Sequence, residues 1–500
     1  MAVNYSQVLA GLRKVYHSGK TKDLEWRKQQ LRALVKFLED EKDAIVEALK
    51  KDLRKSKVEG YMFENLLCRN DAINAINNLE EWTSPQKVKK PIVNLADDCF
   101  IRYEPLGVAL VIGAWNYPIQ LTLLPLVGGI AAGNCVVLKP SEVAEATAEL
   151  LEKVLPKYMD NDAIKIINGG VAETSALLKE RFDHIFYTGN SAVGKIVMEA
   201  AAKHLTSVTL ELGGKSPTYV DGSSDLNIAA KRIMWGKFCN AGQTCIAPDF
   251  VLCTKDVQDK LIGEMKTVLQ EFYGTDPQKS QDFGRIINNR HFNRVKGLIM
   301  PDKVAIGGQC DEKDNYVSPT VLKDVKPEDP CMQQEIFGPV LPIMPIKDKD
   351  AAIEYINAHE KPLAMYVFSK NDAVIKELMT TCTSGGLCVN DIMMHAGVET
   401  MPFGGVGNSG MGGYHGKFTF DEFSHKRSCM IRKQAMEAAN SLRCPPYTDQ
   451  KASWLAWIMK KNEKKTGIAG FLPIVIIGII AAFIFRLFGL QNYLPKALTQ

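Results

Sequence analysis

Cys245 is the residue of this 500-residue chain that is best placed to act as a nucleophile. It ends the segment Phe238–Cys245, whose glycine-containing approach leaves backbone amides free to stabilise both a thiolate and an oxyanion. The other eleven cysteines are scattered between Cys68 and Cys444 with no C-x-x-C pair, and we interpret them as packing residues of a reduced, cytosolic protein. The sequence therefore predicts thiol chemistry at one position, and neither a zinc ribbon nor a disulfide framework.

Asn116 is a candidate donor for the same chemistry. It stands in the segment Trp115–Pro118, directly after an apolar run at Val108–Ile112 that is typical of a buried strand. There its side-chain amide could donate a hydrogen bond to a developing oxyanion. Three further segments accompany the cysteine and asparagine segments: Glu211–Lys215, Glu335–Val340 and Pro402–Gly405.

A glycine loop follows the apolar run at 184–187 and opens onto a helix-like stretch at Lys195–Ala202. Free N–H groups and the helix dipole at such a turn attract phosphate. A nucleotide-triphosphatase P-loop is disfavoured because Ile196 stands where that motif needs Ser or Thr, and the loop is not G-x-G-x-x-G either. A plain structural turn is the alternative. The candidate phosphate-binding residues are Gly189, Asn190, Ser191, Ala192, Val193 and Gly194.

Lys139 and Glu142 follow another apolar run, Cys135–Leu138. At the carboxyl end of a strand, Lys139 could hydrogen-bond ribose hydroxyls, and Glu142 would repel a 2′-phosphate and favour NAD over NADP. A solvated charged loop is the alternative interpretation.

The elements that must hold these residues are predicted from hydrophobic periodicity. Short apolar runs alternate with helix-compatible stretches, which favours a parallel, doubly wound α/β sheet with ligands beyond the carboxyl ends of its strands. Residues 22–50 predict one long amphipathic helix after an N-cap at Thr21. The runs of the first sheet are Val108–Ile112, Cys135–Leu138, Ile164–Ile167 and Ile185–Tyr187. Those of a second α/β domain are Thr218–Val220, Phe250–Cys253, Met365–Phe368 and Leu387–Val389.

Charge is concentrated at the C-terminus. Residues 451–500 hold seven Lys or Arg and one acid, a net charge of +6, which leaves the body at −2 although the whole chain carries +4. A slightly acidic body without basic stripes gives no footprint for nucleic acid, so no nucleic-acid partner is expected. Hydrophobic residues at 46% and charged residues at 24% exclude wholesale disorder.

The segment Thr466–Phe485 carries no charge and is long enough to cross a bilayer as a helix, whereas a buried core helix is the alternative. Lysines precede this segment and few charges follow it, so the positive-inside bias predicts a C-terminal tail anchor with the body in the cytosol. Just upstream, Trp454 and Trp457 beside lysines resemble an interfacial helix, although a plain surface helix fits equally. We hypothesise that residues 453–461 lie near the substrate mouth.

Five blocks, taken in chain order, resemble those of the aldehyde dehydrogenase superfamily, and family-like sequence covers about residues 5–440. The blocks are Trp115–Pro118, Val136–Glu142, Glu211–Lys215 with Phe238–Cys245, Glu335–Val340 and Pro402–Gly405. The short N-terminus is similar to the class 3 branch, and the apolar C-terminus adds a similarity to its membrane-bound fatty aldehyde members. The resemblance implies two doubly wound α/β domains, a Rossmann-like NAD-binding domain and a catalytic domain, with a small bridging element, a C-terminal transmembrane helix, NAD as cofactor and a homodimer. The implied limits are 1–80 and 106–212 for NAD binding, 213–424 for catalysis, 81–105 and 425–445 for bridging and oligomerisation, 446–465 for a basic amphipathic linker and 466–488 for the anchor.

The resemblance also implies a role for each matching residue. Cys245 matches the nucleophile, whose thiohemiacetal oxyanion is held by Asn116 and the Cys245 N–H. Glu211 matches the general base of thioester hydrolysis and ranks first for that role, while Glu335 matches a nicotinamide-ribose ligand that shares the base role in class 3 enzymes. The remaining matches are Lys139 and Glu142 at the adenosine ribose, Gly189–Gly194 at the pyrophosphate, and Tyr117, Phe337 and Phe403 near the nicotinamide or substrate. No metal is expected.

The predicted function is NAD-dependent oxidation of long-chain aliphatic aldehydes to fatty acids, because a membrane-tethered enzyme meets lipid-dissolved substrates and each buried CH₂ contributes about 0.8 kcal/mol. The predicted location is the endoplasmic reticulum membrane. Two alternatives remain open: a cysteine-dependent acyltransferase or esterase, and a catalytically silent membrane-anchored scaffold.

Overall fold

The computed structural model describes residues 4–435, 437–461 and 463. Its N-terminal part is helical, and Leu31, Leu34 and Leu38 bury one face of α2 (Leu24–Asp40). The single helix predicted for 22–50 is wrong, because α2 ends at Asp40 and α3 (Lys42–Leu53) begins after Glu41. The predicted cap is wrong too: Asp23, not Thr21, accepts the Trp26 N–H at 2.7 Å. The other N-terminal helices are α1 (Tyr5–His17), α4 (Lys57–Gly60), a π-helical turn (Tyr61–Asn65) and α5 (Leu66–Thr83).

The first large sheet has six strands in the order β17-β7-β6-β3-β4-β5. Neighbouring strands are parallel except at β17. The runs in β3, β4 and β6 are wholly buried, as expected where both faces of a parallel sheet are covered by helices. The strands are β3 (Val108–Ile112), β4 (Cys135–Lys139), β5 (Ile164–Ile166), β6 (His184–Thr188), β7 (Ser207–Glu211) and β17 (Gly410–Met411).

Two helices define the doubly wound topology of this sheet. The chain steps from β3 to β4 through α6 (Gln120–Ala132) and from β6 to β7 through α9 (Ser191–Ala202), in opposite directions along the sheet. Right-handed crossovers therefore place α6 and α9 on opposite faces, and the strand order reverses between β3 and β6, which is where open α/β sheets bind their ligands. The other helices of this part are α7 (Glu145–Val154), α8 (Val171–Leu177) and α16 (Lys417–Glu422).

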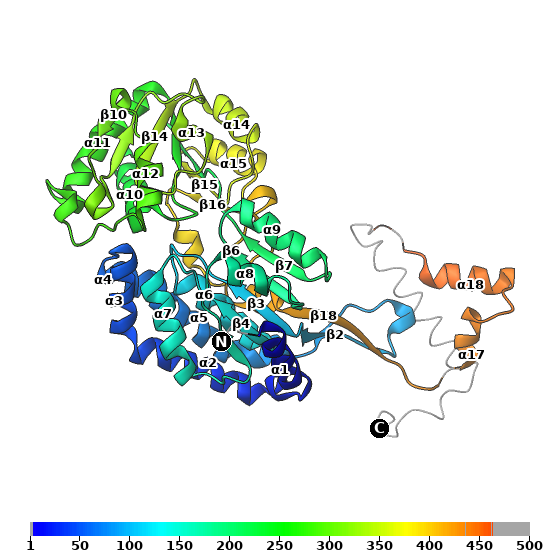
Figure 1. Ribbon diagram of the computed structural model, residues 1–500. Coiled ribbons are helices and arrows are strands. Elements are labelled where there is room, and N and C mark those ends of the chain that lie inside the picture. Colours follow the sequence, from blue (N-terminus) through cyan, green and yellow to red (C-terminus); the bar gives the residue numbers. More distant parts are fainter. Residues whose placement is uncertain (1–3, 436, 462, 464–500) are drawn as a thin grey trace, which may run out of the picture. The chain divides into compact units, whose positions relative to one another are not determined.

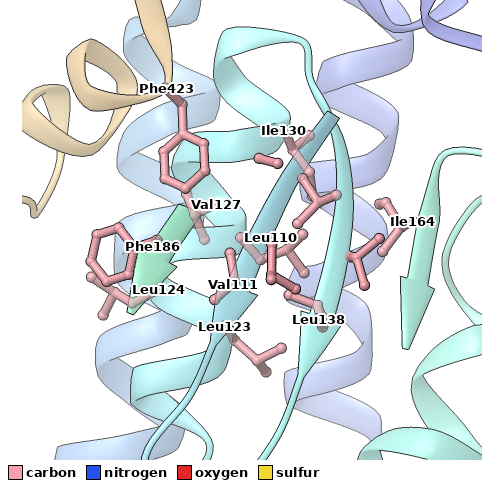
Figure 2. Close-up of a cluster of buried hydrophobic side chains, with 14 of the residues drawn as sticks. Leu110, Val111, Leu123, Leu124, Val127, Ile130, Leu138, Ile164, Phe186 and Phe423 are labelled. Atoms are coloured by element: carbon pink, nitrogen blue, oxygen red, sulfur yellow. The ribbon is translucent and has the colours of Figure 1, made fainter. Parts of the chain in front are cut away.

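Helix α6 is apolar on every side because every side is covered. Figure 2 shows its Leu123, Leu124, Val127 and Ile130 packed against the strand residues Leu110, Val111 and Leu138, with Phe186 and Phe423 alongside. On another side α16 comes so close that a β-carbon on Gly128 would lie 2.2 Å from a Thr419 methyl carbon. This packing fixes the start of α6, which follows the loop that carries Asn116.

The second large sheet has seven strands in the order β10-β13-β14-β9-β8-β15-β16, and only β10 is antiparallel to its neighbour. Figure 1 shows it in green and yellow among its own helices. Its strands are β8 (Pro217–Val220), β9 (Phe250–Cys253), β10 (Val304–Ile306), β13 (Thr320–Leu322), β14 (Val340–Pro345), β15 (Ala364–Phe368) and β16 (Gly386–Val389). Its helices are α10 (Leu226–Phe238), α11 (Lys255–Tyr273), α12 (Asn289–Lys296), α13 (Pro330–Gln333), α14 (Lys349–Asn357) and α15 (Asp372–Thr381). The predicted α/β fold with two domains is confirmed.

Smaller elements complete the description. A three-stranded sheet has the order β1-β2-β18, and β11 pairs with β12. The chain divides into one compact unit of Met1–Gln86 and Ile101–Arg427, and a second that comprises Lys87–Phe100 and the residues from Ser428 on. The bounds are β1 (Gln86–Lys87), β2 (Asp98–Pro105), β11 (Cys310–Asp311), β12 (Tyr316–Val317), β18 (Ser424–Ile431), α17 (Glu437–Asn440) and α18 (Asp449–Met459).

Part of the predicted C-terminal linker is helical. Trp454 and Trp457 lie on α18, about half exposed, with ring centroids 6.1 Å apart. Within the described ranges, no helix combines the length and the apolar character needed to cross a bilayer. The predicted anchor at 466–488 lies outside those ranges.

Candidate active site

The predicted catalytic side chains lie at the carboxyl ends of the strands in the first sheet and at the amino ends of the strands in the second sheet. Asn116 and Glu211 lie at the carboxyl edge of the first sheet, one after β3 and the other at the end of β7. Cys245 and Glu335 lie at the amino edge of the second sheet, where they precede β9 and β14. The expectation that ligands sit beyond the carboxyl ends of strands therefore describes the first sheet only. In the second sheet, the loops that lead into the strands carry the candidate residues.

Cys245 lies within electrostatic reach of both candidate carboxylates. Desolvation by the surrounding protein raises the pKa of the Cys245 thiol well above its usual range, and the charges of Glu335 and Glu211 raise it further. The backbone N–H groups of Cys245 and Ile246 act in the opposite direction by donating hydrogen bonds to the sulfur. The structure thus brings the predicted nucleophile together with both carboxylates and two backbone donors.

Glu211 is a buried carboxyl without a structural partner. It is 2% exposed, and neither oxygen has a hydrogen-bond partner among the residues that the structure describes. Burial raises the pKa of the Glu211 carboxyl well above its usual range, and the nearby Glu422 adds to this. A buried polar group without a partner destabilises the fold, so Glu211 has the character of a functional residue.

Glu335 is held more firmly than Glu211. Burial and the nearby Asp249 raise the pKa of its carboxyl to about 8, against the opposing effects of the Gly214 N–H, Lys215 and Arg294. The carboxylate lies against the backbone of Gly213, where an added β-carbon would fall 2.4 Å from Oε2. Because Gly213 is two residues beyond Glu211, the two carboxylates flank one short stretch of chain.

Asn116 is tied directly to the segment that carries the cysteine. Its side-chain amide donates to the Gln243 carbonyl at 3.0 Å, two residues before Cys245. Its own carbonyl accepts hydrogen bonds from Lys55 Nζ and from Asn240 Nδ2, both at 2.8 Å. The Asn116 amide group has two N–H donors, and the hydrogen bond to the Gln243 carbonyl uses one of them. The other could donate to an oxyanion.

Sequence analysis missed the residues that support this arrangement: Lys55, Glu64, Asn240 and Gln243. Asn240 and Ala241 have consecutive positive φ angles of 52° and 50° in the short turn Cys239–Gly242. Gln243 is fully buried and donates to the Asn240 and Arg285 carbonyls at 3.0 and 2.9 Å. Such strain, held in place by several hydrogen bonds, is typical of functional sites. The one sequence signal was the dense run of Asn, Gly and Gln before Cys245.

The glycine loop has the geometry of a phosphate cradle. Asn190 caps α9 by accepting the Val193 N–H at 3.0 Å, and the first residues of the helix are open to solvent. A β-carbon on Gly189 would fall 2.1 Å from the Tyr187 hydroxyl, so no larger residue fits there without a shift. Gly194 is buried against Leu212, which leaves the N-terminus of α9 and its dipole for an anion.

Lys139 and Glu142 form the other half of the candidate dinucleotide site. Lys139 is 2% exposed and donates to Glu142 Oε2 at 2.6 Å and to its neighbouring Pro140 carbonyl at 2.9 Å. Lys139 is the last residue of β4 and Glu142 follows it, and β4 is adjacent to β3 in the sheet. The alternative of a freely solvated loop does not describe Lys139, and these residues, with the α9 terminus and the reversal of strand order beside β3, fit a dinucleotide.

Aromatic residues flank the candidate site. Phe337 has a positive φ of 46° and packs edge-on against Trp115, with ring centroids 5.3 Å apart. Tyr117 is buried, and its hydroxyl shares a hydrogen bond with Thr244 Oγ1 at 2.9 Å. Tyr117 therefore helps to hold the segment that carries Cys245. Phe403 stacks on His415 with ring centroids 5.2 Å apart.

His415 also lines a cavity of about 660 Å³. Its lining combines apolar side chains, such as Leu67 and Leu124, with polar ones, such as Asn74 and Asp71.

Comparison with known proteins agrees with this arrangement. The family model described as the aldehyde dehydrogenase family matches residues 4–429. The chain belongs to the aldehyde dehydrogenase family. Aldehyde dehydrogenase family 3 member A2 of Pongo abelii is 50% identical, with 95% of this chain and 98% of that protein covered. The dimeric NADP-preferring aldehyde dehydrogenase of Mus musculus is 53% identical, with 89% and 98% covered.

Among solved structures, the substrate-bound state of Staphylococcus aureus AldH has a TM-score of 0.90 and 39% identity, and the match covers 92% of this chain and all of that one. The predicted class 3 aldehyde dehydrogenase and its nicotinamide dinucleotide cofactor are confirmed at the level of the family.

Proposed function

We propose that this aldehyde dehydrogenase oxidises long-chain aliphatic aldehydes to fatty acids with NAD, through a thioester on Cys245. The observation that carries the proposal is the convergence of Glu211 and Glu335 on Cys245, whose thiol pKa both carboxylate charges raise, beside an asparagine amide hydrogen-bonded to the cysteine segment. A thiol, an amide donor and a carboxyl without a structural partner are the groups that acyl chemistry through a covalent intermediate requires.

The first step is attack of the Cys245 sulfur on the aldehyde carbon. An S–C bond forms, the carbonyl oxygen becomes an oxyanion, and the thiol proton must pass to an acceptor. Asn116 and the Cys245 N–H donate to the oxyanion. Burial raises the pKa of the Glu211 carboxyl, so its ionised form binds a proton more readily than an exposed carboxylate does, and it is the acceptor that we assign. A bound nicotinamide dinucleotide supplies the hydride acceptor that turns the resulting thiohemiacetal into a thioester.

The second step is hydrolysis of that thioester. A water molecule must lose a proton as it attacks the acyl carbon, and the Cys245 sulfur leaves. Glu211 is our first choice of base because both of its oxygens are without partners in the described structure. It must first pass the proton that it took from the Cys245 thiol to solvent, and it then accepts the proton of the attacking water. Glu335 ranks second, because the Gly214 N–H and its position against Gly213 hold its carboxylate in place.

NAD is the preferred dinucleotide in this proposal. Glu142 accepts a hydrogen bond from Lys139 at the carboxyl end of β4, and a carboxylate beside the bound ribose would repel the additional phosphate of NADP. The mouse relative whose name states an NADP preference makes this choice a question for experiment.

Long-chain substrates are proposed from the C-terminal sequence. Residues 466–488 would anchor the chain in the endoplasmic reticulum membrane, with α18 and the lysines that follow it in the sequence at the bilayer surface and the catalytic body in the cytosol. Chains dissolved in the bilayer would then reach the site at high local concentration. We assign the cavity beside His415 to the part of the aldehyde that lies away from Cys245.

A homodimer built on residues 425–445 is part of the proposal. The strand β18 lies at an edge of its sheet and is largely exposed, and such edges pair readily with another chain. The mass of the detergent-solubilised protein, measured by light scattering, tests this point: twice the chain mass supports it, and the mass of one chain contradicts it.

The substrate class is tested by a series of aldehydes from acetaldehyde to hexadecanal, assayed with NAD in detergent. The proposal expects kcat/KM to rise with chain length, because each added CH₂ contributes transfer energy. A flat series would contradict the long-chain assignment. The role of the tail is tested in vesicles, where deletion of residues 466–500 should lower the kcat/KM for hexadecanal and leave that for acetaldehyde unchanged.

A further inference from the structure

The side chains of Lys55 and Glu64 form an ion pair in the interior of the protein. Both residues are distant in sequence from Asn116 and Cys245. Their exposed fractions are 1% and 0%. A buried ion pair is weak evidence for stability, because desolvation of two charges offsets their attraction and an apolar pair of similar volume often serves as well. Stability alone therefore does not explain why these two charges are buried, and their other contacts indicate what they do.

Both ions use their remaining hydrogen-bonding capacity on one turn, residues 116–120 between β3 and α6. Lys55 Nζ donates to the Asn116 carbonyl at 2.8 Å and lies 3.8 Å from the centre of the Tyr117 ring. Glu64 Oε2 accepts the Ile119 N–H at 2.8 Å and the Gln120 N–H at 3.3 Å. The cation thus binds a carbonyl of the turn, and the anion binds two of its N–H groups.

Asn240 joins this turn to the cysteine segment. Its side-chain amide donates to the carbonyls of both Asn116 and Gln243, at 2.8 and 3.1 Å. The side chain of Asn116 donates to the same Gln243 carbonyl at 3.0 Å. The orientation of the Asn116 amide is consequently set by contacts that begin at the Lys55–Glu64 pair.

We propose that Lys55 and Glu64 are positioning residues for acyl transfer to Cys245, and that they act by aiming the Asn116 amide at the oxyanion. The inference rests on the proposed function, since it needs an oxyanion at Cys245. Loss of one oxyanion donor typically lowers kcat by a factor of about 10² to 10³, and small misplacement of a group is nearly as damaging.

The test is a double-mutant cycle on the rate of acylation. The paired change Lys55→Met with Glu64→Gln removes both charges, leaves neither ion unpaired, and retains an oxygen at position 64 for the Ile119 N–H. Acylation of Cys245 is followed as nitrophenolate release from p-nitrophenyl acetate, and in parallel as the burst of NADH from hexanal. The cycle is completed by Asn116→Ala alone and by all three changes together.

We expect the paired change to slow acylation by about 10-fold to 100-fold in the wild-type background, a smaller loss than removal of the donor itself causes, because Asn116 is still present but displaced. Added to Asn116→Ala, it should change the rate by less than about 3-fold, because groups that act through one another are not additive. Equal losses in both backgrounds would show that Lys55 and Glu64 do not act through Asn116, and would overturn the proposal.

A matched control separates positioning from general destabilisation. Lys303 and Asp329 form another ion pair with little exposure, just before β10 and α13, and within the described part of the chain the Asp329 carboxylate otherwise accepts only the Lys326 N–H. Lys303→Met with Asp329→Asn should lower the melting temperature and leave acylation within about 2-fold. If this control slows acylation as much as the Lys55–Glu64 change does, the proposal is wrong.

A second variant serves if the paired change prevents folding. Asn240→Gly keeps the positive φ without a steric penalty and removes the donor to Asn116. It should reproduce the loss in the wild-type background only, and additive losses would again overturn the proposal. Failure of the proposed function is distinguishable, because the wild-type enzyme itself would then release neither nitrophenolate nor NADH through Cys245.

Discussion

The carboxylate of Glu335 lies so close to Gly213 that a β-carbon on that glycine would fall 2.4 Å from Oε2. Gly213 is not among the glycines with a positive φ, so its backbone conformation does not require glycine. Glycine is required there only because a side chain would collide with Glu335. A space reserved for a carboxylate beside Glu211 indicates that the position of Glu335 matters to the site.

Gly213→Ala is expected to displace Glu335 and to lower kcat by about 10-fold or more, because misplaced catalytic groups lose orientation. The contacting atoms are the far end of a flexible side chain, so the melting temperature should change by only a few degrees. Gly263→Ala in α11 is the matched control, since nothing lies within 4 Å of its added β-carbon and it should leave kcat unchanged. An unaltered kcat in Gly213→Ala would show that Glu335 is not placed by this contact.

Glu211→Gln and Glu335→Gln test which carboxylate acts as base. If Glu211 is the base, Glu211→Gln should retain a stoichiometric burst of NADH and lose steady-state turnover by about 10² or more, because the thioester forms but hydrolyses slowly. Glu335→Gln should then lose less turnover. Mass spectrometry of the quenched protein measures the accumulated thioester, and accumulation in Glu335→Gln alone would reverse the ranking.

Stability should fall as the pH rises from about 4 to about 7, because of Asp71. Burial, with the charge of Glu399 in addition, raises the pKa of this carboxyl from 3.8 to about 7, against the Gly416 N–H that it accepts. The native state therefore holds a proton that the unfolded chain has released across this window, and each pKa unit corresponds to about 1.4 kcal/mol. Asp71→Asn should flatten the fall measured by urea unfolding at pH 5 and pH 8. An unchanged difference between the two pH values would contradict the assignment.

Dinucleotide preference is tested at Glu142. Glu142→Gln should raise kcat/KM for NADP by about 10-fold and change that for NAD by less than about 3-fold, because it removes a charge that repels the 2′-phosphate. Glu145→Gln, a change of charge nearby on α7, is the control. Equal changes for both dinucleotides in Glu142→Gln would remove the basis for assigning NAD.

The sequence located buried strands well where both faces are covered. The predicted bounds Val108–Ile112 of β3 and Phe250–Cys253 of β9 are those observed, because continuous apolar runs have one stable place in a parallel sheet. β7 was missed although it ends at Glu211. Its sequence starts with an exposed Ser207 and mixes polar with apolar residues, so no continuous run marks it.

The catalytic segments were also visible in the sequence, whereas their support was not. Lys55 and Glu64 stand in a charged stretch that resembles a solvated helix face, and only tertiary contacts show that both are buried. Likewise, the break at Glu41 between α2 and α3 leaves the 3.6-residue period nearly intact, so one continuous helix was predicted. Local pattern reports periodicity and composition, and it does not report which charged groups meet inside the fold.

The most direct test of the account is NADH formation by the detergent-solubilised full-length protein with hexadecanal, comparing the wild type with Cys245→Ser. The account predicts NADH formation that requires both NAD and Cys245, together with an acyl adduct on Cys245 in quenched wild-type protein. NADH formation by Cys245→Ser at the wild-type rate, or none by folded wild-type enzyme that binds NAD, would contradict it.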